Sequence, residues 1–198
     1  MDEGQPMTTE PTSAHTVDIA ALRTEQARGI LPRHIPARYR DATVTDPSVA
    51  QWVADVVAGG TDSILLAGGV GVGKTYHGYA ALAAVVLGKA ARGESCQPAA
   101  ITHGDLCAAV RPDGEGIDRV LSADVLLLDD LGAAHTTVWN ADAVNRVIDH
   151  RWADMLPTIV TSNFDPGTLS AQLSERVTSR LFGMCRTVQL TGADRRRS

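Results

Sequence analysis

The sequence is poor in cysteine and lacks any long apolar run. Its three cysteines are scattered and form no C-x-x-C pair, so they do not make a disulfide framework. We interpret them as reduced thiols of a cytosolic protein. No run of 18 apolar residues is present, which excludes a membrane-spanning helix. The first residues lack the basic start and apolar stretch of a signal peptide, so we expect a cytoplasmic protein.

Patterns for zinc and for base stacking are also absent. No cysteine precedes Cys96, and the histidines do not stand at metal-ligand spacings, which argues against a zinc-binding module. Aromatic residues make up only 4% of the chain, so few rings are available to stack on nucleic-acid bases. The net charge of −5 excludes a general polycation. Any contact with nucleic acid must therefore come from a local patch such as Arg195–Arg197.

The composition predicts one globular domain with a short appendage. The chain has 198 residues, of which 44% are apolar and 21% charged. Residues 1–16 are rich in Thr, Pro, Glu and Ser and are expected to be disordered. Residues 17–30 predict a short helix with a thin apolar stripe that it cannot bury alone, so the segment is either a floppy arm or a docking helix for a partner. We divide the chain into a flexible arm, 1–34, and a globular domain, 35–198.

Helical and apolar segments alternate through the globular domain. The expected strands are Ser63–Ala67, Ala99–Thr102, Val125–Leu128 and Thr158–Thr161. The expected helices are Pro47–Val57, Lys74–Arg92, one from about Asp105, Asn140–Met155 and Leu169–Leu181. The strands are continuous apolar runs, which is typical of strands buried on both faces. The pattern predicts an α/β fold with a parallel sheet flanked by helices.

A glycine-rich loop follows the first of these strands. Gly68 to Thr75 reads Gly-Gly-Val-Gly-Val-Gly-Lys-Thr and fits G-x-x-x-x-G-K-[ST], the pattern of a phosphate-binding P-loop. The glycines let backbone N–H groups point at phosphate oxygens, and the following helix adds its positive dipole end. Lys74 is expected to reach the outer phosphates and Thr75 to offer its hydroxyl to Mg²⁺. The residues expected to contact ATP here are Gly68, Gly69, Val70, Gly71, Val72, Gly73, Lys74, Thr75 and Tyr76.

Polar residues follow two later strands. Asp129 and Asp130 come directly after an apolar run, at the sheet edge where ligands of open α/β sheets bind. Asp129 would hold Mg²⁺ directly or through water, and Asp130 would orient or deprotonate the attacking water. Asn163, or alternatively Ser162, could hydrogen-bond the γ-phosphate or that water. Together with the glycine loop, these residues predict a site for ATP and Mg²⁺.

Two arginines stand four residues apart in the last predicted helix. Arg176 and Arg180 therefore share a face. The simpler interpretation is a solvated face, or pairing with Glu175 and its neighbours. In an ATPase that works as a ring or filament, one such arginine reaches the γ-phosphate held by the neighbouring subunit. The pattern alone leaves both interpretations open.

With these motifs in this order, the chain resembles the DnaC/IstB group of AAA+ ATPases, which are helicase loaders of bacteria and phages and helper ATPases of certain transposons. The resemblance covers more than three quarters of the 198 residues. The matching stretches are Ile35–Tyr39, Gly68–Thr75, Leu126–Gly132, Ile148–Arg151, Leu156–Phe164, Glu175–Met184 and Gly192–Arg196.

The resemblance implies a role for each motif. Lys74 and Thr75 belong to the Walker A motif, and Asp129 and Asp130 to Walker B. Asn163 is similar to the first sensor, on a strand that lies between the two Walker strands. The trans-acting arginine finger is Arg180, with Arg176 as its rival, and the second sensor is Arg196 or an adjacent arginine. No separate lid domain is expected after these arginines.

The function implied is that of an ATP-dependent helicase loader. Such a protein binds a DnaB-type replicative helicase and single-stranded DNA, self-assembles through the arginine finger, and uses ATP binding and hydrolysis to load the helicase when DNA replication begins. One alternative is an IstB-like helper of a DNA transposase. Another is a nucleotide-dependent scaffold with little hydrolysis, because Asp130 is shorter than the glutamate usual in AAA+ proteins. We expect slow turnover unless DNA or a partner stimulates it. The Ala-, Gly- and Arg-rich composition hints at a GC-rich bacterium or its phage.

Overall fold

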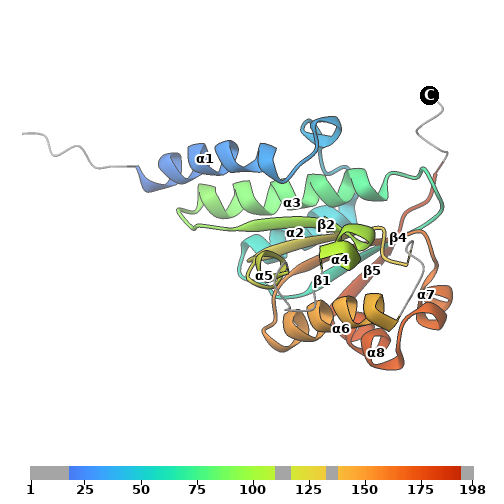
Figure 1. Ribbon diagram of the computed structural model, residues 1–198. Helices are drawn as coiled ribbons and strands as arrows, with labels where there is room; N and C mark the ends of the chain where they lie inside the picture. The colour runs from blue at the N-terminus through green and yellow to red at the C-terminus, as the bar shows by residue number, and fades with distance from the viewer. Residues whose placement is uncertain (1–17, 110–116, 133–137, 193–198) are drawn as a thin grey trace, which may run out of the picture.

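The computed structural model describes residues 18–109, 117–132 and 138–192, which form a five-stranded parallel sheet with helices on both faces (Figure 1). The strands are β1 (Ser63–Ala67), β2 (Pro98–Thr102), β3 (Val125–Asp129), β4 (Thr158–Ser162) and β5 (Cys185–Gln189). Their order is β2-β3-β4-β1-β5, and every neighbouring pair is parallel. The predicted α/β architecture is confirmed, and β4 lies between β3 and β1 as the resemblance implied.

The helices cover the sheet in two layers. On one face lie α1 (Ile19–Ile30), α2 (Pro47–Val57) and α3 (Lys74–Ala91), and on the other α4 (His103–Ala109), α5 (Asp118–Leu121), α6 (Val138–Ala153), α7 (Pro166–Gln172) and α8 (Glu175–Met184). Strand β3 shows why both layers form: Leu127 packs into the first layer's core, and Leu126 and Leu128 into the second. Strands β1, β3 and β4 are buried at every residue, which explains the apolar runs of β1 and β3. In β4 the buried hydroxyl groups of Thr158, Thr161 and Ser162 are hydrogen-bonded instead.

The single helix expected over Leu169–Leu181 is wrong, because the structure has two helices there. Helix α7 ends at Gln172, and Leu173 is extended, with ψ 159°. The hydroxyl of Ser174 then accepts a hydrogen bond from the backbone N–H of Val177 at 3.3 Å and caps α8. A serine at this position favours the start of a new helix over the continuation of the old one.

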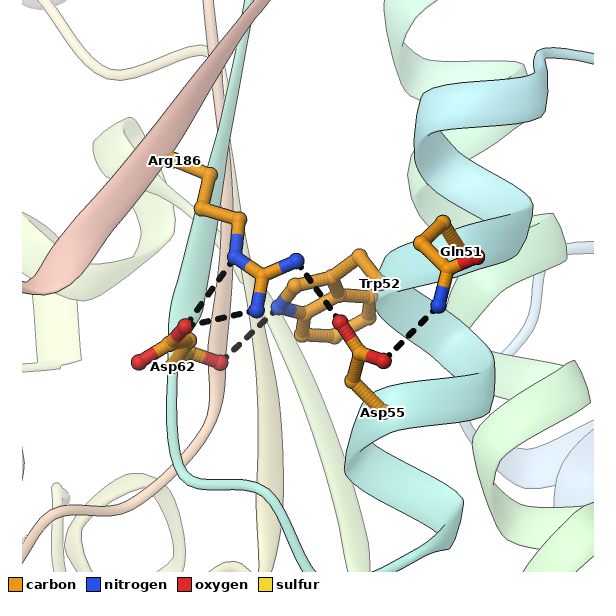
Figure 2. Close-up of polar contacts among 5 residues, drawn as sticks. All are labelled: Gln51, Trp52, Asp55, Asp62 and Arg186. Carbon is orange, nitrogen blue, oxygen red and sulfur yellow. Dashed lines mark hydrogen bonds and ion pairs between the residues drawn. The ribbon is translucent and has the colours of Figure 1, made fainter.

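Strand β5, which the sequence did not predict, is fixed at the sheet edge by an arginine (Figure 2). Arg186 donates to Asp62 from Nε at 3.0 Å and from Nη2 at 2.8 Å, and from Nη1 to Asp55 at 2.7 Å. Gln51 donates to Asp55 at 2.9 Å, and the indole N–H of Trp52 donates to the backbone oxygen of Asp62 at 2.8 Å. These contacts tie β5 to α2 and to the residue that precedes β1.

Helix α1 packs along α3 (Figure 1). Its bounds, Ile19–Ile30, are close to those of the helix expected over residues 17–30. Ala27, Leu31 and Ile35 are buried in the core cluster that contains α3, whereas Ile19 and Leu22 are 59% and 51% exposed. The segment before Asp18 lies outside the described residues. The domain boundary after residue 34 and the docking role of the helix therefore stay predictions.

Within the described ranges, no helix combines the length and the apolar character that crossing a membrane requires.

Candidate nucleotide-binding site

The glycine loop connects the carboxyl end of β1 to the start of α3. Gly73 is the residue that caps α3, in a left-handed conformation with φ 98°. Gly68 has φ 151°, and a Cβ built on it would lie 2.3 Å from the backbone oxygen of Leu190, which follows β5. The N–H of Leu190 in turn donates to the backbone oxygen of Ala67 at 2.8 Å. The end of β5 therefore packs directly on the first residue of the loop, and only glycine fits there.

Lys74 lies folded against the loop. Its side chain is almost buried, with 5% of its surface exposed, and its ammonium group donates to the backbone oxygens of Gly68 at 2.9 Å and Gly69 at 2.6 Å. The positive charge is thus held at the mouth of the loop, beside the amino end of α3. Both features favour an anion at this position.

The two residues expected to hold Mg²⁺ are in contact. Asp129, the last residue of β3, accepts a hydrogen bond at Oδ1 from the hydroxyl of Thr75 at 3.1 Å and another from the hydroxyl of Thr161 at 2.5 Å. Burial raises the pKa of Asp129, as does the neighbouring charge of Asp130, while the hydrogen bond from Thr161 lowers it. A carboxylate beside a hydroxyl is the hard oxygen donor set that Mg²⁺ prefers, so the residues present fit this ion.

Asp130 and Asn163 lie next to this pair. Asp130 has a left-handed backbone, with φ 56°, and its N–H donates to the hydroxyl of Thr161 at 2.9 Å. The side-chain amide of Asn163, just after β4, donates to a carboxylate oxygen of Asp130 at 3.5 Å. The side chain of Ser162 points elsewhere, donating to the backbone oxygen of Leu131 at 2.8 Å. Of the two candidates at the end of β4, Asn163 is therefore the one that faces Asp130.

Lys74, Thr75, Asp130 and Asn163 face a cavity of about 540 Å³, whereas Asp129 is not among the residues that line it. It is lined by Arg38, Tyr39, Val70, Gly71, Gly73, Lys74, Thr75, Tyr76, Asp130 and Asn163. The other loop residues that the sequence singled out lie outside this lining, and among them Val72 packs into the hydrophobic core.

One wall of the cavity comes from a segment whose role the sequence did not predict. The short 3-10 helix η2 (Ala37–Tyr39) supplies Arg38 and Tyr39. The ring of Tyr39 stacks on that of Tyr79 in α3, with 5.0 Å between the ring centres and 13° between the planes. The hydroxyl of Tyr76 accepts from the N–H of Thr43 at 3.0 Å and fastens the following loop to α3. Residues 35–39 were part of the family resemblance, and that match was the signal in the sequence that could have pointed to this wall of the cavity.

The two candidate finger arginines do not reach this cavity. Arg176 and Arg180, both on α8, form ion pairs with Asp149 on α6, and the guanidinium of Arg180 lies 4.9 Å from the ring centre of Trp152. The intramolecular partner is therefore Asp149 rather than Glu175. The predicted second sensor, Arg196, lies outside the described residues with Arg195 and Arg197.

The sheet order, the glycine loop between β1 and α3, and the acids at the end of β3 define the chain as a P-loop NTPase fold of the AAA+ type. No family model matches the sequence. Over 95 residues the chain is 34% identical to the replicative helicase loader DnaI of Bacillus subtilis strain 168, a match that spans 41% of this chain and 30% of DnaI.

Solved structures extend the likeness beyond that stretch. A crystal structure of DnaI has a TM-score of 0.62 at 26% identity, covering 87% of this chain and 99% of that one. A crystal structure of the DnaC helicase loader has a TM-score of 0.66 at 22% identity, covering 78% and 99%. These matches support a DnaC/DnaI-type AAA+ family for the chain, and the sequence match spans less than a third of the length of DnaI.

Proposed function

We propose that the chain binds ATP together with Mg²⁺ in the cavity beside the glycine loop. The observation that carries the proposal is the contact between Thr75 and Asp129 at the foot of a loop that also holds Lys74. Lys74 would contact the outer phosphates, and Thr75 and Asp129 would hold the metal ion. Bound Mg²⁺ would neutralise phosphate charge and polarise the phosphoryl group. The cavity volume of about 540 Å³ lies in the range of small-molecule sites.

The other wall of the cavity suits the base of the nucleotide. Tyr39 presents a ring already held by stacking on Tyr79, and Tyr76 lines the same space. Flat aromatic surfaces favour a planar ring such as adenine, and the guanidinium of Arg38 can stack on it or pair with phosphate. The nucleotide would therefore span from the η2 segment to the glycine loop.

The same site would also hydrolyse ATP. Asp130 would accept a proton from an attacking water, and Asn163, which contacts Asp130, would orient that water or the γ-phosphate. The aspartate side chain is one methylene shorter than a glutamate, so the water would be held less closely. We therefore propose a slow ATPase that DNA or a protein partner stimulates.

The cellular role we propose is that of a helicase loader. The likeness to DnaI over the AAA+ core supports it. The exposed side chains of Ile19 and Leu22 on α1 supply an apolar contact for a DnaB-type replicative helicase. ATP binding would favour self-assembly on single-stranded DNA, with Arg180 or Arg176 of one copy reaching the γ-phosphate in the next. Hydrolysis would then release the loader.

Substitution of Lys74 tests the nucleotide site. Lys74→Ala removes a charge-assisted contact, so the affinity for ATP should fall roughly 10- to 100-fold. The affinity is measured by titration with a fluorescent ATP analogue. Lys89→Ala, a change of the same kind at the far end of α3, is the matched control and should bind as the wild type does. Equal affinity of the Lys74 variant and the wild type would overturn the site.

Size-exclusion chromatography with light scattering tests whether the partner of this chain is a replicative helicase. The full chain with ATP should form a complex with a DnaB-type helicase, and Leu22→Glu should weaken that complex. Met155→Glu is the matched control, since Met155 is also an exposed apolar residue, at 65%. If intact, ATP-bound protein formed no complex, the loader role would be wrong, and a transposase helper or a nucleotide-dependent scaffold would replace it.

A further inference from the structure

Helix α8 is held on α6 by three side chains that form one stripe. Asn145, Asp149 and Trp152 stand at positions i, i+4 and i+7, so they share a face of α6. Asn145 accepts a hydrogen bond from the hydroxyl of Ser174, which caps α8, at 3.1 Å. Asp149 and Trp152 hold the arginines further along α8. None of these three side chains lines the nucleotide cavity, so the stripe is a separate feature of the molecule.

A single carboxylate serves both arginines. Oδ2 of Asp149 lies 2.8 Å from Nη2 of Arg176, and Oδ1 pairs with Nη1 of Arg180. The two arginine side chains are not held equally, because Arg176 is 66% exposed and Arg180 only 22%. Arg180 has the carboxylate at its edge and the Trp152 ring against its face, which is the arrangement of a cation–π contact. Arg180 is therefore engaged within its own chain.

We propose that Asp149 is an intramolecular competitor for Arg180, and that assembly requires the arginine to exchange this carboxylate for the γ-phosphate of ATP bound to the next copy. The inference rests on the proposed self-assembly through this arginine. A guanidinium binds carboxylate and phosphate through the same planar fork of N–H groups, so one set of donors cannot serve both at once. A phosphate carrying more negative charge than the carboxylate would win the exchange. ADP has no γ-phosphate, so the arginine would return to Asp149 after hydrolysis.

The exchange needs only a local movement. The capping contact between Ser174 and Asn145 lies at the first turn of α8, away from Arg180 in the second turn. Val177 and Leu181 are buried and keep the helix docked whichever anion the arginine binds. A change in the side chain of Arg180 would therefore be enough to switch it between Asp149 and a neighbouring nucleotide.

Asp149→Asn tests this competition, because asparagine keeps the shape of the side chain and removes its charge. Assembly is followed by light scattering of the full chain against protein concentration, with a non-hydrolysable ATP analogue and Mg²⁺. The variant should assemble at a concentration about three- to tenfold lower than the wild type, as expected for the loss of one partly buried ion pair. Adding Arg180→Ala to this variant should abolish the gain. Asp154→Asn makes the same charge change just after the end of α6, without contact to Arg180, and should assemble as the wild type does.

The possible outcomes separate the inference from the function on which it rests. If the wild type assembles, Arg180→Ala prevents it, and Asp149→Asn gives no gain, the competition is wrong and Asp149 serves to present the arginine. If neither the wild type nor Asp149→Asn assembles with the ATP analogue, the proposed self-assembly is wrong, and the inference is wrong with it. Should Asp149→Asn unfold, Trp152→Leu loosens Arg180 while keeping the ion pair. If Trp152→Leu lowers the assembly concentration, by less than the three- to tenfold expected for Asp149→Asn, the competition is supported. If it leaves the assembly concentration unchanged, the competition is overturned.

Discussion

The hydroxyl of Thr161 in β4 donates to Oδ1 of Asp129 at 2.5 Å and accepts from the backbone N–H of Asp130 at 2.9 Å. One side chain thus joins both acids at the end of β3 to the neighbouring strand. Thr161 is fully buried, so its bonds are protected from competition with water. We infer that it holds the two acids in position at the end of β3, where the proposed site would bind the metal ion and the attacking water.

Removing this hydroxyl should affect stability and metal binding together. Thr161→Val keeps the volume but leaves the Asp130 N–H and one side of Asp129 without this partner, which costs roughly 1–3 kcal/mol of unfolding free energy. Denaturant unfolding measures the loss, and titration with Mg²⁺ and an ATP analogue should show weaker binding. Thr187→Val, at an exposed position of β5, is the control and should change neither quantity. Unchanged stability of the Thr161 variant would show that the contact does not hold the acids.

The buried charge of Asp129 should lower the stability of the metal-free protein, although the proposed binding of Mg²⁺ requires it. Its pKa is raised chiefly by burial, so the ionised form is disfavoured in the folded protein relative to the unfolded chain. The metal-free protein should therefore become more stable, through this group, as the pH falls toward the pKa of the folded state. Asp129→Asn at pH 7 should melt at or above the wild-type temperature without Mg²⁺. The same variant should lose most of the stabilisation that Mg²⁺ and ATP give the wild type. A metal-free variant that melted well below the wild type would contradict this account.

Two adjacent glycines should respond differently to alanine. A Cβ at Gly68 would meet the backbone of Leu190 at 2.3 Å, and φ is 151°, so Gly68→Ala should cost roughly 2–3 kcal/mol. Gly69 has nothing within 4 Å of a built Cβ, and Gly69→Ala should stay within about 1 kcal/mol of the wild type. Thermal unfolding compares the two variants. Equal losses would mean that β5 does not press on the loop in solution.

Acid should weaken the fold through His103. Burial lowers its pKa below 6.5, and its Nδ1 accepts from the N–H of Gly132 at 3.3 Å, which requires an unprotonated nitrogen. The unfolded chain therefore takes up the proton first, and stability should fall as the pH drops below about 6.5. Urea unfolding at pH 8 and at pH 5.5 measures the slope.

The substitution His103→Gln should flatten that slope. Part of it should remain, because burial and the charges of Arg119 and Arg33 also lower the pKa of His34. His150→Gln, at a more exposed histidine of α6, controls for the substitution itself. A slope unchanged by His103→Gln would assign the acid sensitivity to other groups.

Local patterns predicted the features that depend on neighbours in the chain. The apolar run Val125–Leu128 predicted a buried strand because it is apolar on both faces, and β3 is buried on both. The glycines before Lys74 predicted the tight loop and the start of α3, because few other residues adopt those backbone angles. The order of the motifs was enough for the resemblance to imply the place of β4 in the sheet.

Features that arise from distant contacts were not predicted. Strand β5 has a mostly polar sequence, and it forms by pairing with β1, more than 120 residues earlier, where Arg186 also binds Asp55 and Asp62. The break between α7 and α8 depends on Ser174 capping a helix that packs on α6. Tyr39 reaches the cavity because Tyr79, forty residues later, holds its ring.

By itself, therefore, the sequence determined the class of fold, the phosphate loop and the acids that face it, because these follow from backbone preference and from the burial of continuous apolar strands. Only the tertiary structure decided which residues complete the site and which residues contact the two candidate finger arginines. Thr161 beside Asp129, Tyr39 on the cavity wall and Asp149 beneath Arg180 each depend on two elements meeting in space. The hydrophobic periodicity of a sequence does not show which distant residues come into contact in the folded chain.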